Sequence, residues 1–172
     1  MLNKNVEKAL NEQIERESFS SNLYLAMASW ADTNGYPGSA EFLYVQAEEE
    51  RLHMLKIFRF INNREGKAVV PALKQPEHQF NSIKAVFQEV LGHEKFISDS
   101  INKLVGICID ERDFTTVNFL QWYVNEQIEE ENTARTIVDR LNLLGDDKVQ
   151  LYMFDRDLKT VRQSATSAVN NA

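Results

Sequence analysis

Cysteine is almost absent from this chain, which has 172 residues and a single thiol at Cys108. One thiol excludes an intramolecular disulfide, a zinc or iron–sulfur site made of four cysteines, and a CxxC redox pair. We therefore expect a protein of the reducing cytoplasm. A chain of this length buries roughly 70% of its unfolded surface, so it needs no disulfide or metal to fold. Any metal site would therefore be functional.

Long apolar runs and clustered positive charge are also lacking. No apolar run approaches the ~20 residues that cross a bilayer, and the opening MLNKNVEKALNEQ is charged and amphipathic, unlike a signal peptide. The formal net charge is -7. Nucleic-acid binding requires clustered lysine and arginine that contact phosphates. We therefore expect neither a membrane nor a nucleic acid as a partner, and cations are the better candidates.

Glycine and proline are scarce, with six and three residues, and they occur in clusters that divide the chain into long helices. The breaks fall at residues 32–38, 66–80, 108–113 and 143–147. Asp110 and Asp113 are candidate N-caps in the third break, and Gly145 marks a helix end in the fourth. We predict helices over about 5–33, 39–65, 81–109, 113–144 and 147–163. They form one domain, residues 1–163, and we expect residues 164–172 to be a flexible tail.

The lengths of the connections predict the topology. Short turns make the first and second helices, and the third and fourth, antiparallel neighbours. The link over residues 66–80 can span up to ~50 Å, which exceeds the ~40 Å length of a helix of ~27 residues. The second and third helices can therefore run parallel. The fold class is all-α, an up-down-down-up four-helix bundle with one long crossover and a short fifth helix.

Each of the four long helices carries an apolar stripe at three- and four-residue spacing, and polar residues interrupt each stripe near its middle. The interruptions are Glu17 in the first helix, Glu50 and His53 in the second, Glu94 in the third, and Gln127 and Glu130 in the fourth. Helices that run the full length of a bundle bring their midpoints to one level. These six side chains should therefore converge.

Converging buried carboxylates require a cation, because each unpaired buried ion costs several kcal/mol. No lysine or arginine interrupts these stripes, which leaves protons or metal ions. Four carboxylates balance two divalent cations, and oxygen ligands with one imidazole suit ferrous iron or manganese. The alternative is that each Glu lies on the solvated face of a misoriented helix. That reading holds for most of the run Glu48–Glu50, since at most one of three successive helical residues points inward.

Other residues near the stripes are weaker candidates. Tyr24 lies seven residues after Glu17 on the same helix face, where it could hydrogen-bond or donate an electron to a bound metal. Trp122 is a less favoured donor, and both rings could be plain core aromatics. His93 is turned ~100° from the stripe, so a surface or subunit contact is expected rather than ligation. Cys108 ends an apolar stripe, which indicates buried packing.

The segments ERESFSSNLYLAMASW, AEEERLHM, GHEKF and NEQIEEE, followed by a short fifth helix, resemble the ferritins, specifically the bacterial non-haem type. The resemblance covers essentially the whole chain. It implies a ferroxidase centre for two irons formed by Glu17, Glu50, His53, Glu94 and Gln127, with Glu50 bridging and Tyr24 beside it. It also implies a third iron site nearby, formed by Glu49, Glu126, Glu129 and Glu130. The position of Glu130 in the apolar stripe of the fourth helix places it with the ferroxidase centre, whereas the resemblance places it between that centre and the third site.

Differences from three related protein families argue against membership of those families. Haem-binding relatives carry a second Glu-x-x-His on the fourth helix and a Met directly after the second-helix Glu. Here these positions read Gln127–Glu130 and Arg51, so no haem is expected. Rubrerythrin-like relatives need a four-cysteine iron domain, which one cysteine cannot make. Miniferritins that protect DNA place their irons between subunits and lack the fifth helix.

The resemblance implies that Fe(II) is oxidised by O2 or H2O2 at the iron pair and stored as ferric mineral inside a hollow 24-subunit shell. We expect the apolar stripe of the fifth helix to contact other subunits around a symmetry axis, or alternatively to pack on its own bundle. The stripe consists of Leu151, Phe154, Leu158 and Val161. Two other functions stay open. They are a di-iron oxidase or peroxidase that retains its metals, and a non-catalytic helical binding protein.

Overall fold

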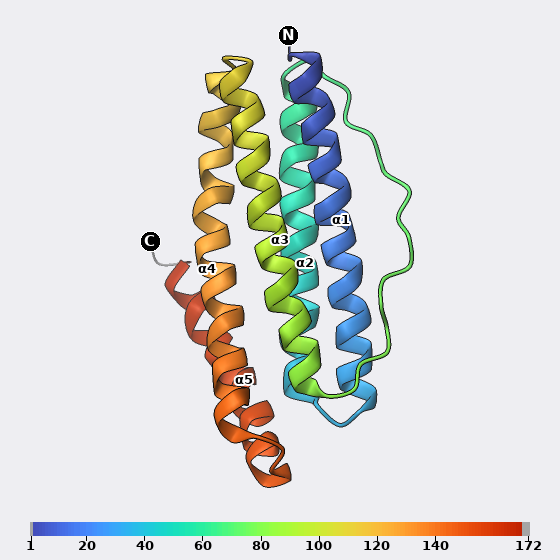
Figure 1. Cartoon of the computed structure of the whole chain (residues 1–172), viewed down its shortest axis with the longest axis vertical. Coiled ribbons are helices and arrows are strands. Elements are labelled where there is room, and N and C mark those ends of the chain that lie inside the picture. Colours follow the sequence, from blue (N-terminus) through green and yellow to red (C-terminus); the bar gives the residue numbers. More distant parts are fainter. Residues whose placement is uncertain (1, 170–172) are drawn as a thin grey trace.

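The computed structural model describes the backbone of residues 2–169 and the side chains of residues 2–158. The described chain contains five helices and no strand: α1 (Lys4–Thr33), α2 (Pro37–Asn63), α3 (Ile83–Asp110), α4 (Phe114–Leu144) and α5 (Lys148–Val169). In Figure 1, α1 to α4 lie side by side, and the crossover between α2 and α3 runs along the outside of α1 for nearly the whole length of the bundle. The predicted all-α bundle with one long crossover is confirmed.

Local capping explains where the helices begin. The side chains of Asn3, Ser82 and Asp113 accept hydrogen bonds from backbone N–H groups in the first turns of α1, α3 and α4. Asp113 is therefore a cap as predicted, whereas Asp110 is the last residue of α3. Pro37 starts α2, where its missing N–H costs no helical hydrogen bond.

The end of α5 differs from the prediction. The helix continues to Val169, past the expected end near residue 163, because no glycine or proline interrupts this segment. Residues 170–172 lie outside the described part of the chain, and the flexibility of the tail stays a prediction. None of the described helices combines the length and the apolar character that a membrane span requires.

A polar layer divides the apolar core into two clusters. One cluster lies at the α5 end of the bundle and includes Leu23, Leu43 and Phe87. The other lies at the opposite end and includes Ile14, Ile57, Ile97 and Tyr123. On each long helix the sequence passes from one cluster to the other across the stripe interruption. The polar residues that interrupt the stripes of the four helices therefore lie at one level of the bundle.

Helix α5 packs on its own bundle. Phe154 and Leu158 are buried in the nearer core cluster, where the Phe154 ring meets the Phe87 ring edge-on at 6.2 Å between centroids. Asp155 accepts hydrogen bonds from the backbone N–H groups of Gly38 and Ser39 at 2.8 and 2.7 Å.

The prediction that the α5 stripe contacts other subunits is wrong for Phe154 and Leu158, because these residues cover the open end of the core. Leu151 is partly buried against the same cluster. Val161 lies outside the residues whose side chains the structure describes.

Candidate metal centre

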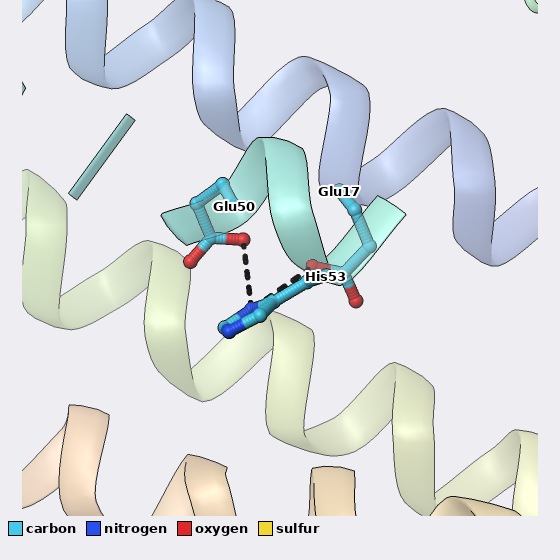
Figure 2. A group of neighbouring side chains, drawn as sticks. All are labelled: Glu17, Glu50 and His53. Atoms are coloured by element: carbon cyan, nitrogen blue, oxygen red, sulfur yellow. Dashed lines mark ion pairs between the residues drawn. The ribbon is translucent and has the colours of Figure 1, made fainter. Parts of the chain in front are cut away.

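Three of the predicted side chains form a compact buried group. Glu17 of α1 and Glu50 and His53 of α2 each offer one ligand atom, and these atoms lie within 4.8 Å of one another. His53 Nδ1 is 3.7 Å from Glu50 Oε2 and 4.0 Å from Glu17 Oε2, as Figure 2 shows. Both carboxylates are 1% exposed. Neighbouring helices therefore place two carboxylates and one imidazole in a geometry that a single metal ion can bridge.

Two carboxylate oxygens in this group have no hydrogen-bond partner among the described residues. They are Glu17 Oε2 and Glu50 Oε2, both fully buried. The other Glu17 oxygen accepts a hydrogen bond from the Gln13 amide at 2.8 Å. An unpaired buried carboxylate oxygen is costly, so buried polar atoms are normally paired with a donor or a cation. These two oxygens face His53 without accepting a hydrogen bond, and they fit a cation.

Helices α3 and α4 supply the opposite side of the polar layer. The Tyr24 hydroxyl donates a hydrogen bond to Glu94 Oε1, and the Gln127 amide donates one to Glu94 Oε2 at 3.0 Å. All three side chains are buried. The structure therefore brings Glu94 and Gln127 together in the layer and places Tyr24 directly beside them.

Glu130 also lies in the buried layer. Its Oε2 accepts a hydrogen bond from the Gln46 amide at 2.9 Å, and its side chain is 9% exposed. Of the other residues implied for a third site, Glu49 and Glu126 are partly buried and Glu129 is exposed. In the described side chains these four do not form a group as compact as that of Glu17, Glu50 and His53.

Burial and mutual repulsion raise the pKa values of these carboxyl groups. Desolvation, followed by the charge of Glu50, raises the pKa of Glu17 well above its usual range. Desolvation, followed by the charge of Glu94, does the same for Glu50, and burial also raises the pKa of Glu94. For Glu130, desolvation and then the charge of Glu94 raise the pKa to about 7. Without a metal the layer therefore holds protons near neutral pH.

Sequence reasoning missed two buried glutamines that support the carboxylates. Gln13 contacts Glu17, and Gln46 contacts Glu130. Each glutamine precedes a stripe Glu of its own helix by four residues, so it lies on the same helix face. This repeated Gln-x-x-x-Glu spacing, 13–17 and 46–50, is the signal that could have identified them.

The weaker candidates lie around the layer. His93 is half-buried, its Nε2 is 2.7 Å from Ser20 Oγ, and its ring meets the Tyr24 ring edge-on, so it packs within the chain rather than lying free on the surface. Burial lowers the pKa of His93 to about 4. The Trp122 ring lies 5.2 Å from the His53 ring and stays partly exposed.

Comparisons with known proteins agree with this arrangement. Residues 7–144 match the family model of the ferritin-like domain. The chain is 46% identical over 165 residues to a probable bacterial non-haem ferritin-like protein of Haemophilus influenzae, covering 96% of this chain and 100% of that one. It is 43% identical to a bacterial non-haem ferritin of Campylobacter jejuni, over 95% and 98% of the two chains.

Solved structures give the same result. An open-pore ferritin from the archaeon Archaeoglobus fulgidus superposes with a TM-score of 0.90 at 40% identity, covering 92% of this chain and 96% of that one. The shared bundle, the short terminal helix and the similarity along nearly the whole chain lead to one conclusion: this protein belongs to the ferritin family.

Proposed function

We propose that this protein stores iron, and that it oxidises Fe(II) to Fe(III) with O2 or H2O2 at a centre for two irons within one subunit. The observation that carries the proposal is the pair of buried, unpartnered oxygens on Glu17 and Glu50 beside His53. Membership of the ferritin family supports iron as the cation. Oxygen ligands with one imidazole suit Fe(II).

The two irons are substrates held by different helices. In this proposal Glu17, Glu50 and His53 bind the first iron, and Glu94 and Gln127 bind the second, with Glu50 bridging. Iron binding displaces the protons that the raised pKa values keep on Glu17 and Glu50 in the metal-free centre. Two Fe(II) ions together supply the two electrons that reduce O2 to H2O2, or H2O2 to two water molecules, with uptake of two protons. The Tyr24 hydroxyl holds Glu94 in position through its hydrogen bond.

The ligand set is asymmetric, and this asymmetry favours passage of iron through the centre. Gln127 contributes a neutral amide where a charged carboxylate would hold a cation more strongly. The second iron is therefore bound more weakly than the first, and Fe(III) can leave for the mineral. The third site, formed by Glu49, Glu126, Glu129 and Glu130, is proposed to receive iron nearby. Equal iron affinities and mineralisation rates in wild type and Gln127→Glu would contradict this explanation.

Storage requires an enclosed volume, which a single bundle does not provide. We propose that the chain assembles into the hollow 24-subunit shell that is typical of ferritins, and that it works in the cytoplasm without haem. The net charge of -7 per chain is multiplied by assembly and attracts cations.

The test is iron loading of the assembled protein. Fe(II) is added aerobically in excess, the protein is separated by size-exclusion chromatography, and iron per chain is counted in the protein peak. We expect a large assembly that retains far more than the ~2 irons of a di-iron centre. Retention of about two, with the rest precipitating, would instead indicate an enzyme that keeps its metals.

Two matched variants test whether iron loading depends on the proposed di-iron centre. Glu50→Gln removes the proposed bridging carboxylate and should abolish rapid Fe(II) oxidation. Glu48→Gln makes the same chemical change two residues away on the exposed face of α2, and should oxidise iron like the wild type.

A further inference from the structure

On two sides of the buried layer, aromatic rings lie between the carboxylates and the bundle surface. Between α1 and α3, the packed rings of Phe19, Tyr24 and His93 separate the layer from a surface cavity. Between α2 and α4, the Trp122 ring covers His53, and the Lys56 ammonium lies 3.5 Å above the centre of the Trp122 ring. The Trp122 ring blocks this side sterically, and the Lys56 ammonium repels an approaching cation.

The side between α3 and α4 is different. A surface groove of about 370 Å³ lies between these helices, and its lining includes Gln127 together with Ser98, Glu131 and Arg135. Gln127 is therefore shared between the groove and the buried layer. Because Gln127 is a proposed iron ligand, the groove reaches one ligand of the second iron position.

Polar groups follow one another along this groove. The Ser98 hydroxyl donates a hydrogen bond to Glu131 at 2.5 Å, and the Gln127 amide lies 3.4 Å from the Ser98 oxygen and 3.0 Å from Glu94 Oε2. The path from surface to centre is thus lined by the Glu131 carboxylate, the Ser98 hydroxyl and the Gln127 amide, in that order. The carboxylate and the hydroxyl offer oxygen atoms of the kind that Fe(II) accepts, whereas the Gln127 Nε2 donates hydrogen bonds to Ser98 and Glu94.

Charge along the groove also favours a cation. The Glu131 side chain is 25% exposed, so solvent reaches its carboxylate. Burial raises the pKa of Glu94, hydrogen bonds from Tyr24 and Gln127 and the charge of His53 oppose this, and the charge of Glu131 makes the smallest contribution, which raises it further. A cation attracted to Glu131 is therefore close enough to interact electrostatically with Glu94. The Arg135 guanidinium, 3.6 Å from Glu131, partly offsets this attraction at the mouth of the groove.

We propose that the groove between α3 and α4 is an access route for divalent cations, in which Glu131 binds the ion at the mouth and Ser98 passes it to Gln127. The proposal rests on the proposed function, since it assumes that Glu94 and Gln127 hold iron. Neither Ser98 nor Glu131 belongs to the ligand sets of the two iron sites or of the third site. Both act on how fast the ion arrives rather than on how tightly it is finally held.

The experiment separates arrival from binding. Co(II) is mixed anaerobically with the metal-free full-length assembly, and its ligand-field absorption is followed by stopped flow, while equilibrium titration measures affinity. Glu131→Gln should slow binding on the order of threefold, and Arg135→Gln should accelerate it by a similar factor, because one unit charge near the path changes the local cation concentration by that order. Both effects should shrink at high salt.

Two further variants complete the test. Ser98→Leu fills the groove without changing its charge, and should slow binding with unchanged equilibrium affinity. Asp139→Asn removes a carboxylate from the exposed part of α4 outside the groove, and should bind Co(II) at the wild-type rate.

Three results would overturn the proposal. Wild-type rates in Glu131→Gln, Arg135→Gln and Ser98→Leu, with Co(II) still bound at equilibrium, would refute the route and leave the proposed function intact. A slower rate in Glu126→Gln but not in Glu131→Gln would place access between α2 and α4. Failure of the wild-type protein to bind Co(II) at all would refute the proposed metal centre together with the route.

Discussion

The buried carboxyl of Glu130 should make the metal-free protein less stable as the pH rises toward neutrality. Burial, followed by the charge of Glu94, raises its pKa from 4.5 to about 7. Between these values the folded state keeps a proton that the unfolded state has lost, so the free energy of unfolding falls with increasing pH. Each pH unit costs about 1.4 kcal/mol, which amounts to about 3 kcal/mol at pH 7.

Glu130→Gln removes this cost. The amide has the same shape, does not ionise, and its oxygen can still accept the hydrogen bond from Gln46. In the absence of metal, we expect the variant to exceed the wild type in free energy of unfolding by about 3 kcal/mol at pH 7. The difference should approach zero below about pH 3.5, one unit under the unfolded-state pKa, where both states of the wild type hold the proton.

Urea unfolding followed by circular dichroism, with a chelator present, measures this difference. Protein concentration is kept constant, because assembly makes apparent stability depend on it. The control is Glu129→Gln, the same change at the exposed neighbouring position, which should alter stability by no more than about 0.5 kcal/mol. A Glu130→Gln variant that is less stable than wild type at pH 7, or whose gain is equal at both pH values, would refute the reasoning.

Three further predictions concern other parts of the molecule. Zn(II) added to the metal-free protein at pH 7 should release protons from Glu17 and Glu50, because burial raises the pKa values of both carboxyl groups. A pH-indicator dye in weak buffer measures the released protons. A titration without proton release would contradict the prediction. Gly38→Ala should destabilise the protein by about 1–3 kcal/mol and expose α5 to proteases, because a Cβ would lie 1.9 Å from a backbone oxygen of α5. Gly106→Ala is its control in the same thermal unfolding and proteolysis assays, since a Cβ there meets nothing within 4 Å. Cys108 is fully buried and burial raises its pKa to about 11, so a thiol reagent should label it only after unfolding, and rapid labelling of native protein would count against its burial.

The residues of the buried polar layer could be predicted from the sequence because the apolar stripe of each helix indicates which face of that helix is buried. Glu94 interrupts the clean apolar stripe of α3, and a helix with one buried face leaves little choice about where that residue points. Asp113 likewise could be recognised as a cap because capping depends on a few adjacent residues. In both cases the information lies within one or two turns of helix.

The errors arose where a contact joins distant parts of the chain. The α5 stripe was expected between subunits, yet Phe154 and Leu158 close the core of their own bundle. His93, for which a surface or subunit contact rather than ligation is predicted, is half-buried beside the Tyr24 ring and lines a surface cavity. An apolar stripe shows that a helix face will be buried but does not show what buries it.

The sequence by itself determined the number of helices, the long crossover and the level at which the polar residues meet, because helical periodicity and connection length are local properties of the chain. Only the tertiary structure decided which oxygens of Glu17 and Glu50 are left without a hydrogen bond, and that the α3–α4 side carries a groove that includes Gln127. These features depend on side-chain conformations and on packing between helices. Such contacts join residues that lie far apart in the sequence, and no spacing within one helix encodes them.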